Sequence, residues 1–273
     1  ALRKASENGH VDVLRFLKDE FGLTADDARD GNNYALQYAA ENGHVDVLRV
    51  LKDDFELTIR DARYFASNPL KSAAKNGHID VLRFLINEFG LTVNDARKYG
   101  HYPHAAAAEN GHVDVLRFLI SELKLNAKDG KVALEAAAGS GRIDVLRFLI
   151  NEFEFTTDDG YYAFSKAAEN GHVEVLRFLK DEFGLITDDA RAKNNYALRR
   201  AAKNGHVEVL RFFKDDFGFT TEDARYYGSY TLESAAEKGH VEVLRFLKDD
   251  FGFTTDIARD QNNKALKFAA ENG

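Results

Sequence analysis

The chain has 273 residues, of which 44% are hydrophobic and 30% charged, a composition typical of a globular protein. The net charge of -8 argues against nucleic acid as a partner, because such binding uses an excess of Lys and Arg against the phosphates. The absence of cysteine excludes disulfides and Cys-based zinc sites. No apolar run approaches about 18 residues, so we expect neither a transmembrane helix nor a membrane partner. Without disulfides or a recognisable signal peptide, an intracellular, cytoplasmic location is favoured.

The stretch Tyr34–Phe55, YALQYAAENGHVDVLRVLKDDF, recurs in close variants along the chain. Its first part, up to Asn42, predicts a helix with Leu36, Ala39 and Ala40 on one face, where the small alanines allow another helix to approach closely. Its second part predicts a longer helix that is apolar on more than one side and therefore packs against more than one neighbour. Such a hairpin cannot bury its own apolar surface, so it needs copies of itself on both sides.

Two residues mark the ends of the predicted first helix. Asn33 is predicted as its N-cap, since an Asn side chain can accept a free N–H of the first turn. Gly43 is predicted to close the helix in the left-handed conformation, which glycine adopts without a Cβ clash. His44 then opens the second helix.

The glycine at the end of the first helix recurs at intervals of 34 residues, except for two intervals of 30 in the middle of the chain. These glycines are Gly9, Gly43, Gly77, Gly111, Gly141, Gly171, Gly205, Gly239 and Gly273. We expect one array over residues 1–273, with about eight full helix-turn-helix units and a terminal helix at 264–272 that no second helix follows. The first residues match the middle of a repeat, which predicts a segment of a longer chain.

A third element is predicted in most connectors. In LTADDAR, Thr24 is followed three residues later by Asp27, which resembles a capping box with Asp in place of Glu. We therefore expect a short extra helix over Thr24–Arg29 and its equivalents. The two shorter intervals lose four residues in the connectors at 125–132 and 155–162, so the extra turn is expected to shrink or vanish there, with a local change of curvature.

The second helices barely vary between units, whereas two positions of each first helix and many connector aromatics do. Because Tyr and Arg dominate interface energies, these residues are the predicted partner-binding set. The set comprises Gln37, Tyr38, Tyr64, Phe65, Lys71, Ser72, Tyr99, Tyr102, Glu135, Tyr161, Tyr162, Lys166, Tyr196, Arg199, Arg200, Lys203, Tyr226, Tyr227, Tyr230 and Glu233. Within it, Arg199, Arg200 and Lys203 form the one local basic cluster, which either takes an acidic partner segment or reflects ordinary surface variation.

The order of two alanines, two further residues, Gly-His and V-[DE]-V-L-R-F-L resembles ankyrin repeats, in nine registered copies that cover essentially the whole chain. Pro69 in NPLKSAA and Pro103 in YPHAAAA occupy the Pro column of that family's T-P-L-H motif, in the first turn of a helix, where proline is tolerated. The T-P-L-H column otherwise reads YALQ, YALR or YTLE, so the first-helix His of the family is missing. FGLTADDAR replaces the family's loop, which predicts a short helix in place of the β-hairpin finger.

Catalytic and metal sites are not favoured. Seven of the nine histidines are the Gly-His of a unit, and copies about 10 Å apart cannot share a zinc ion, so we expect them to bond to backbone near the turn. His101 and His104 are three residues apart, but Pro103 breaks helical spacing. No Walker loop or G-x-S-x-G is present, and the carboxylates recur as KDEF or KDDF in most units, which indicates a solvated face. No enzyme and no cofactor are therefore predicted.

A weaker second surface is predicted where Ile86, Ile120 and Ile150 replace the Lys of other units. These residues either pack into the core or form a contact surface. The resemblance implies a non-enzymatic scaffold that binds a protein or peptide on the concave face of the repeats. The alternatives are a structural element that self-associates through open repeat ends, as a filament or spacer, and the targeting arm of a larger multidomain protein.

Overall fold

The computed structural model describes residues 1–63, 68–100, 102–225, 230–259 and 270, without the side chains of residues 32 and 99. Within these ranges the regular structure is entirely helical, which confirms the all-α prediction. The first helices of the hairpins are α1 (Leu2–Glu7), α3 (Ala25–Glu41), α6 (Pro69–Lys75), α9 (Pro103–Asn110), α11 (Ala127–Gly139), α13 (Thr157–Asn170), α16 (Ala192–Lys203) and α19 (Tyr230–Glu237). The second helices are α2 (Val11–Phe21), α4 (Val45–Asp53), α7 (Ile79–Asn87), α10 (Val113–Leu123), α12 (Ile143–Glu152), α14 (Val173–Phe183), α17 (Val207–Phe217) and α20 (Val241–Asp249). The predicted terminal helix at 264–272 lies almost wholly outside the described residues.

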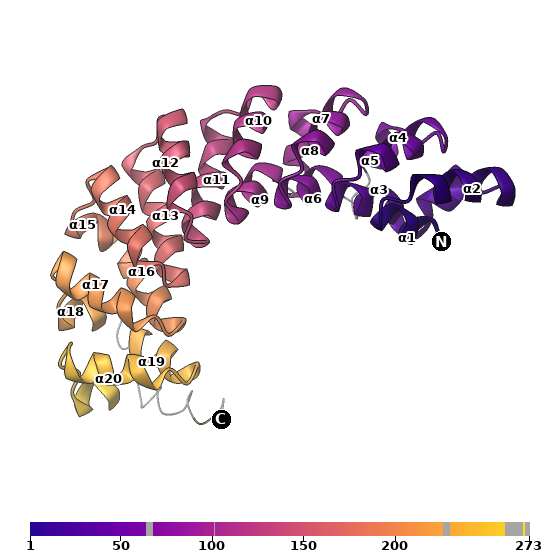
Figure 1. Ribbon diagram of the computed structural model, residues 1–273. Helices are drawn as coiled ribbons and strands as arrows, with labels where there is room; N and C mark the ends of the chain where they lie inside the picture. Colours follow the sequence, from indigo (N-terminus) through magenta and orange to yellow (C-terminus); the bar gives the residue numbers. More distant parts are fainter. Residues whose placement is uncertain (64–67, 101, 226–229, 260–269, 271–273) are drawn as a thin grey trace. The chain divides into compact units, whose positions relative to one another are not determined.

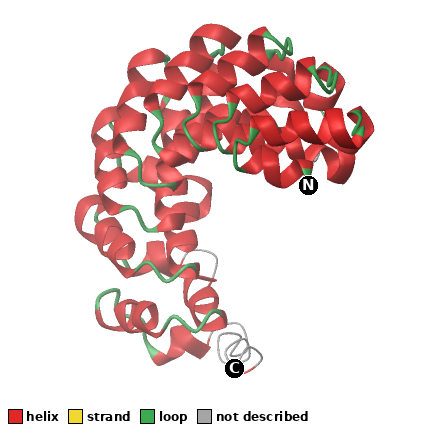
Figure 2. Ribbon diagram, turned by 45° about the vertical axis from the view of Figure 1, so that its right-hand side comes forward, coloured by secondary structure: helices red, strands yellow, loops and turns green. Residues whose placement is uncertain are grey.

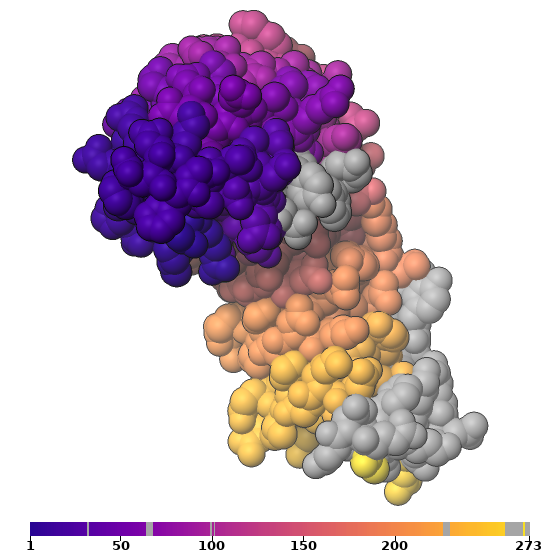
Figure 3. Space-filling model, turned by 90° about the vertical axis from the view of Figure 1, so that its right-hand side faces the viewer, coloured from indigo at the N-terminus to yellow at the C-terminus, as the bar shows by residue number. Residues whose placement is uncertain are grey.

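The chain divides into two compact units, residues 1–134 with 147–153 and residues 135–146 with 154–273. In the first unit, α1, α3, α6 and α9 pack side by side in one layer, and α2, α4, α7 and α10 form a second layer beside it (Figure 1). The second unit repeats this arrangement, with α13, α16 and α19 in one layer and α14, α17 and α20 in the other (Figure 2). In the space-filling view, the N-terminal hairpins in indigo and purple present a continuous surface of side chains (Figure 3).

The first helix of the stretch at Tyr34–Phe55 buries its predicted apolar face. Leu36, Ala39 and Ala40 have no exposed surface, and Leu48 and Leu51 of the second helix have none either. Burying one such leucine contributes about 1.5–3 kcal/mol, and equivalents of these residues are buried in most of the other hairpins. The alanines keep neighbouring first helices close, as the pattern predicts.

The predicted turn is confirmed and ends in a Schellman motif. Gly43 adopts φ +80°, and the N–H of His44 donates to the carbonyl of Ala39 at 2.9 Å, the bond that closes such a helix end. The prediction that Asn33 is an N-cap is wrong. Asn33 is buried with φ +61° inside α3, and its Nδ2 donates to the carbonyl of Asp61 in the next hairpin at 3.4 Å. The positive φ of Gly31 and Asn33 breaks the backbone just before Tyr34, but Asn33 Oδ1 accepts no hydrogen bond from a described residue, so it caps no N–H of the segment that follows.

Short connector helices occur as predicted in four connectors, whereas the one predicted at Thr24–Arg29 forms the start of α3 and is not a separate element. They are α5 (Ile59–Ala62), α8 (Val93–Arg97), α15 (Thr187–Ala190) and α18 (Thr221–Arg225), and the 3-10 turn η1 (Lys98–Gly100) follows α8. In the two shorter connectors no separate helix remains, as predicted, but its capped turn does. The N–H of Thr156 donates to Asp159 at 2.8 Å, and this turn opens α13 directly. In the connectors that are four residues shorter, the capped turn therefore runs into the first helix without an interruption. The predicted change of curvature stays a prediction.

The aspartate of the capping turn has a second role that the sequence analysis missed. Asp61 Oδ2 accepts the N–H of Thr58 at 2.7 Å, and its Oδ1 accepts Arg29 Nε of the preceding connector at 2.8 Å. The same Arg–Asp ion pair joins Arg63 to Asp95 at 2.7 Å, Arg97 to Asp129 at 2.6 Å and Arg191 to Asp223 at 2.6 Å. We call this repeated pairing the Arg–Asp ladder. Its sequence signal is an Arg two residues after the capping Asp, 32 residues before the next one.

A second ladder of cations runs along the second helices. The Arg49 guanidinium lies 5.4 Å from the ring centroid of Phe84 in the next hairpin, which is cation–π distance. The contact recurs between Arg83 and Phe118, Arg117 and Phe148, Arg177 and Phe212, and Arg211 and Phe246. We call it the Arg–Phe ladder. The Arg–Phe contact explains why Arg and Phe recur in the second helices, in addition to the residues that recur because they are buried in the core.

The Arg–Asp ladder makes stability depend on acid pH in a defined direction. Burial by itself would raise the pKa of Asp61, but the hydrogen bonds from Arg29 and Thr58 outweigh it, so the pKa lies below the usual 3.8. A carboxyl group with a lowered folded-state pKa stabilises the fold above its unfolded-state pKa, and this stabilisation is lost as pH falls through the folded-state value. The ladder should therefore weaken below about pH 4.

We expect Asp61→Asn to lower the free energy of unfolding by about 1–2 kcal/mol at pH 7, because it removes the pair with Arg29 and weakens the cap. Asp27→Asn is the matched control. Asp27 caps Thr24 in the same way, at 2.8 Å, and among the described residues it forms no ion pair with an Arg of another connector. Urea unfolding followed by circular dichroism should show the larger loss for Asp61→Asn, and the difference should narrow below about pH 4. Equal losses of unfolding free energy for the two variants would contradict a stabilising role of the Arg–Asp ladder.

Candidate partner-binding face

The Gly-His histidines join successive hairpins. His44 Nε2 lies 3.0 Å from the carbonyl oxygen of Glu7, so the nitrogen carries the proton and donates to the preceding first helix. The same bond is made by His78 to Glu41, His112 to Lys75, His172 to Gly139, His206 to Glu169 and His240 to Lys203, at 2.9–3.1 Å. The prediction of a structural role with a backbone partner is confirmed, and the partner belongs to the neighbouring hairpin.

The same imidazole restricts the turn of the preceding hairpin. A Cβ on Gly43 would lie 2.9 Å from Nδ1 of His78, and one on Gly171 would lie 2.7 Å from Nδ1 of His206. Glycine is therefore needed twice at this position, for its positive φ and for the ring that covers it. We call the combined contact the His–Gly ladder.

His104 differs from every Gly-His histidine. It takes the buried Leu position of α9, is only 1% exposed, and neither ring nitrogen has a hydrogen-bond partner among the described residues. Burial lowers its pKa from 6.5 to about 4, Asp129 opposes the shift and Arg97 adds to it. His101, which the sequence analysis considered with it, lies outside the described residues. His104 is therefore a neutral core residue.

We expect His104→Leu to remove an acid-sensitive element, because the equivalent residues Leu36 and Leu70 are buried leucines. The unfolded chain takes up a proton near pH 6.5 and the folded chain only near pH 4, so the wild type loses stability as pH falls between these values. The stability advantage of the variant should grow by about 2 kcal/mol from pH 8 to pH 5. His10→Gln, at an exposed histidine, is the control for the unfolding measurements. Parallel pH profiles of wild type and His104→Leu would contradict this assignment.

We define the variable face as the two positions after the Leu column of each first helix together with the connector residues beside them. In the first unit, Gln37, Tyr38, Ser72 and Tyr102 are partly exposed and Lys71 is exposed. The face continues between hairpins, because the Arg3 guanidinium lies 5.0 Å from the centroid of Tyr38. Side chains that differ between repeats therefore touch each other along this side.

In the second unit the predicted residues fall into two groups. Tyr162 is 48% exposed, and Lys166 is also exposed. Glu135, Tyr196, Arg199, Arg200 and Lys203 are partly exposed, and Tyr230 is 39% exposed. In contrast, Tyr161 is 5% and Glu233 4% exposed, so neither offers much surface to a partner. Tyr161 instead donates its hydroxyl to the carbonyl of Ala192 at 2.9 Å and ties α13 to the next connector.

The basic cluster is largely engaged within the chain. Arg200 donates to the Tyr196 hydroxyl at 2.9 Å and lies 3.3 Å from Glu169, and Arg199 lies over the ring of Tyr230 at 5.0 Å. An acidic partner segment would have to compete with these contacts. Four predicted residues, Tyr64, Phe65, Tyr226 and Tyr227, lie outside the described residues, as does the side chain of Tyr99.

The three isoleucines of the second surface are partly buried. In other hairpins the Lys of this column reaches the next second helix: Lys52 pairs with Glu88 and Lys214 with Asp250, both at 3.2 Å. Ile86 and its equivalents therefore stand where neighbouring second helices meet. This favours packing, and the contact-surface hypothesis stays a prediction.

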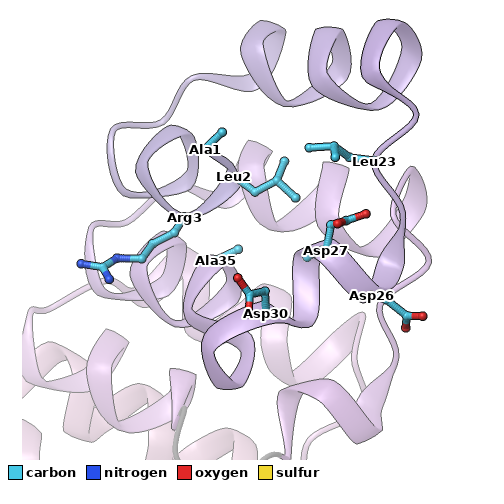
Figure 4. A pocket seen from close by; sticks show the side chains of 9 residues that line it. Ala1, Leu2, Arg3, Leu23, Asp26, Asp27, Asp30 and Ala35 are labelled. Atoms are coloured by element: carbon cyan, nitrogen blue, oxygen red, sulfur yellow. The ribbon is translucent and has the colours of Figure 1, made fainter.

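Two hollows on the first-helix side differ in character. The one at α1 and α3 has a volume of about 520 Å³; Leu2 and Leu23 line it beside acidic residues, and Arg3 points away from these (Figure 4). It holds no convergent charged groups. The other, of about 270 Å³, lies between α13 and α16 and is lined by Tyr161, Tyr162 and Tyr196. We call it the tyrosine pocket.

Neither hollow carries a metal or catalytic constellation. Among the described residues, no group of three or more His, Asp or Glu side chains could hold a metal ion. No helix in the same part of the chain has the length and apolar character that crossing a bilayer demands. The variable face thus offers aromatic, cationic and anionic side chains on a helical support, which suits binding of another chain.

Comparison with known families agrees with the repeat pattern. A family described as ankyrin repeats in three copies matches residues 50–129, 70–159 and 134–223, and one described as ankyrin repeats in many copies matches residues 2–51. Together these matches span most of the chain. No curated protein matches it.

Proposed function

Since the chain belongs to the ankyrin repeat family, we propose that it binds a protein or peptide partner through the variable face. Ankyrin repeats are generally protein–protein interaction modules and are typically non-enzymatic. The observation that carries the proposal is the distribution of differences: the residues of the three ladders recur from hairpin to hairpin, whereas the variable face changes chemistry at almost every step. A constant support with one changing side is what recognition of an irregular partner requires.

A rigid support lowers the cost of binding. The first helices are held by buried Leu and Ala residues and by the His–Gly ladder, so their surface side chains start from fixed positions. Less conformational entropy is then lost when a partner binds, and a modest number of contacts suffices. Aromatic residues such as Tyr38 and Tyr102 supply contact area with few rotatable bonds.

Selection of random 12-residue peptides displayed on phage against the intact chain tests the proposal. Enriched peptides should lose at least tenfold in affinity for the double variant Tyr38→Ala, Lys71→Ala. The double variant Asp46→Ala, Asp80→Ala, at exposed second-helix positions, should bind them as the wild type does. The proposal fails if no peptide is enriched, or if both double variants bind equally well.

A further inference from the structure

The tyrosine pocket already holds an ammonium group of the chain itself. Lys193 Nζ lies 3.4 Å from the ring centroid of Tyr162 and 5.3 Å from that of Tyr161. Both distances are within the range at which a cation is attracted to the negative face of an aromatic ring. The pocket thus has the geometry and the electrostatics to receive a positive charge.

The segment that carries Lys193 is held in an unusual backbone conformation. Lys193, Asn194 and Asn195 all have positive φ, at 51°, 63° and 55°, so these residues of α16 form a left-handed turn and are not helical. Positive φ is unfavourable for residues other than glycine, and less so for Asn than for Lys. The Tyr161 hydroxyl fixes this segment by its bond to the carbonyl of Ala192. The Lys193 side chain is therefore brought to the pocket by a turn that stores strain, and leaving the rings need not unfold a helix.

The pocket also contains a carboxylate without a fixed partner. Glu135 lines the cavity, is partly buried, and forms no hydrogen bond or ion pair with a described residue. Burial raises its pKa, and Lys166 and Lys193 nearby only partly oppose this shift. Glu169, on the same wall, is instead paired with Lys166 at 3.1 Å and Arg200 at 3.3 Å. Glu135 loses part of this compensation when Lys193 leaves, and an added cation then restores it.

The size of the cavity limits what can enter it. At about 270 Å³ it lies just below the range of pockets for drug-sized ligands, about 300–1,000 Å³, and suits a single side chain. Three tyrosine rings can cover the methylene stem of a lysine, and Glu135 with the ring faces can receive its ammonium group. An anionic side chain would meet the negative ring faces and the carboxylate.

We propose that the tyrosine pocket binds a lysine side chain of the partner, and that Lys193 is an internal competitor that leaves the rings when the partner lysine enters. This inference rests on the proposed function for the source of the lysine. The pocket itself can be tested without any partner, because a single amino acid carries the recognised group.

The probes are Nα-acetyl-lysine methylamide, its trimethylated form, and the neutral analogue Nα-acetyl-norleucine methylamide. Each is titrated into the intact chain with isotope-labelled tyrosine rings, and ring shifts are followed by NMR. Either charged probe should shift the signals of Tyr162 and Tyr196, and the norleucine probe should not. Equal shifts with norleucine, or none with either charged probe, would overturn the proposal.

Variants separate the cation–π contact from simple packing. Lys193→Ala should bind the charged probes at least threefold more tightly, because the competitor is gone. Tyr162→Phe keeps the aromatic face and should bind as the wild type does, whereas Tyr162→Leu should bind at least fivefold more weakly with an unchanged circular dichroism spectrum. Glu135→Gln should also weaken binding. Unchanged or weaker binding by Lys193→Ala contradicts the competitor role.

Phe21→Leu, on α2 of the first unit, is the matched control, because this aromatic side chain is 68% exposed, belongs to no predicted binding set and does not line the tyrosine pocket. It should leave the titration unchanged. If the probes fail while peptide selection on the intact chain succeeds, the lysine preference of the tyrosine pocket is lost and the general interaction function stands. If the probes bind while selection fails, the pocket stands and the general interaction function does not.

Discussion

The contact between a histidine ring and the turn glycine of the preceding hairpin is the constraint on which the rest of the structure depends. One ring fills the space above Gly43 and donates a hydrogen bond to the carbonyl of Glu41, so one side chain satisfies a helix end and sets the distance between two hairpins. A free carbonyl at a helix end would otherwise need water. The hydrogen bond recurs for six Gly-His histidines, each of which bonds to the hairpin before it. The repeated contact gives these hairpins a similar spacing.

The other two ladders connect different elements of the repeat. The Arg–Asp ladder links connectors, and the Arg–Phe ladder links second helices on their outer side. Together with the His–Gly ladder they use the turn, the connector and the second helix for holding hairpins together. The variable face takes no part in these three ladders. This division of roles explains how the chain can vary one face at little cost in stability.

The helical hairpins, their turns and their caps could be predicted from the sequence, because each depends on a short pattern that recurs along the chain. The Gly-His turn, the two alanines and the Thr–Asp cap each depend on a few neighbouring residues, and the structure has them where the pattern predicts. Asn33 was misread because its positive φ follows from how the connector helix enters the first helix. The Arg29–Asp61 pair was missed because its partners are 32 residues apart, beyond the reach of local patterns. The tyrosine pocket depends on a left-handed turn at Lys193 that no propensity indicates.

The coupling of hairpins through the His–Gly ladder can be tested by comparing two histidines with nearly the same local sequence, NGHVDV at His10 and NGHIDV at His78. His78 bonds to Glu41 and covers Gly43, whereas His10 is exposed and has no such bond among the described residues. In urea unfolding at pH 7, His78→Ala should lower the free energy of unfolding by about 1–2 kcal/mol, and His10→Ala should change it by less than about 0.5 kcal/mol. Equal effects of the two substitutions would contradict the account, because the ring would then contribute nothing through the neighbouring hairpin.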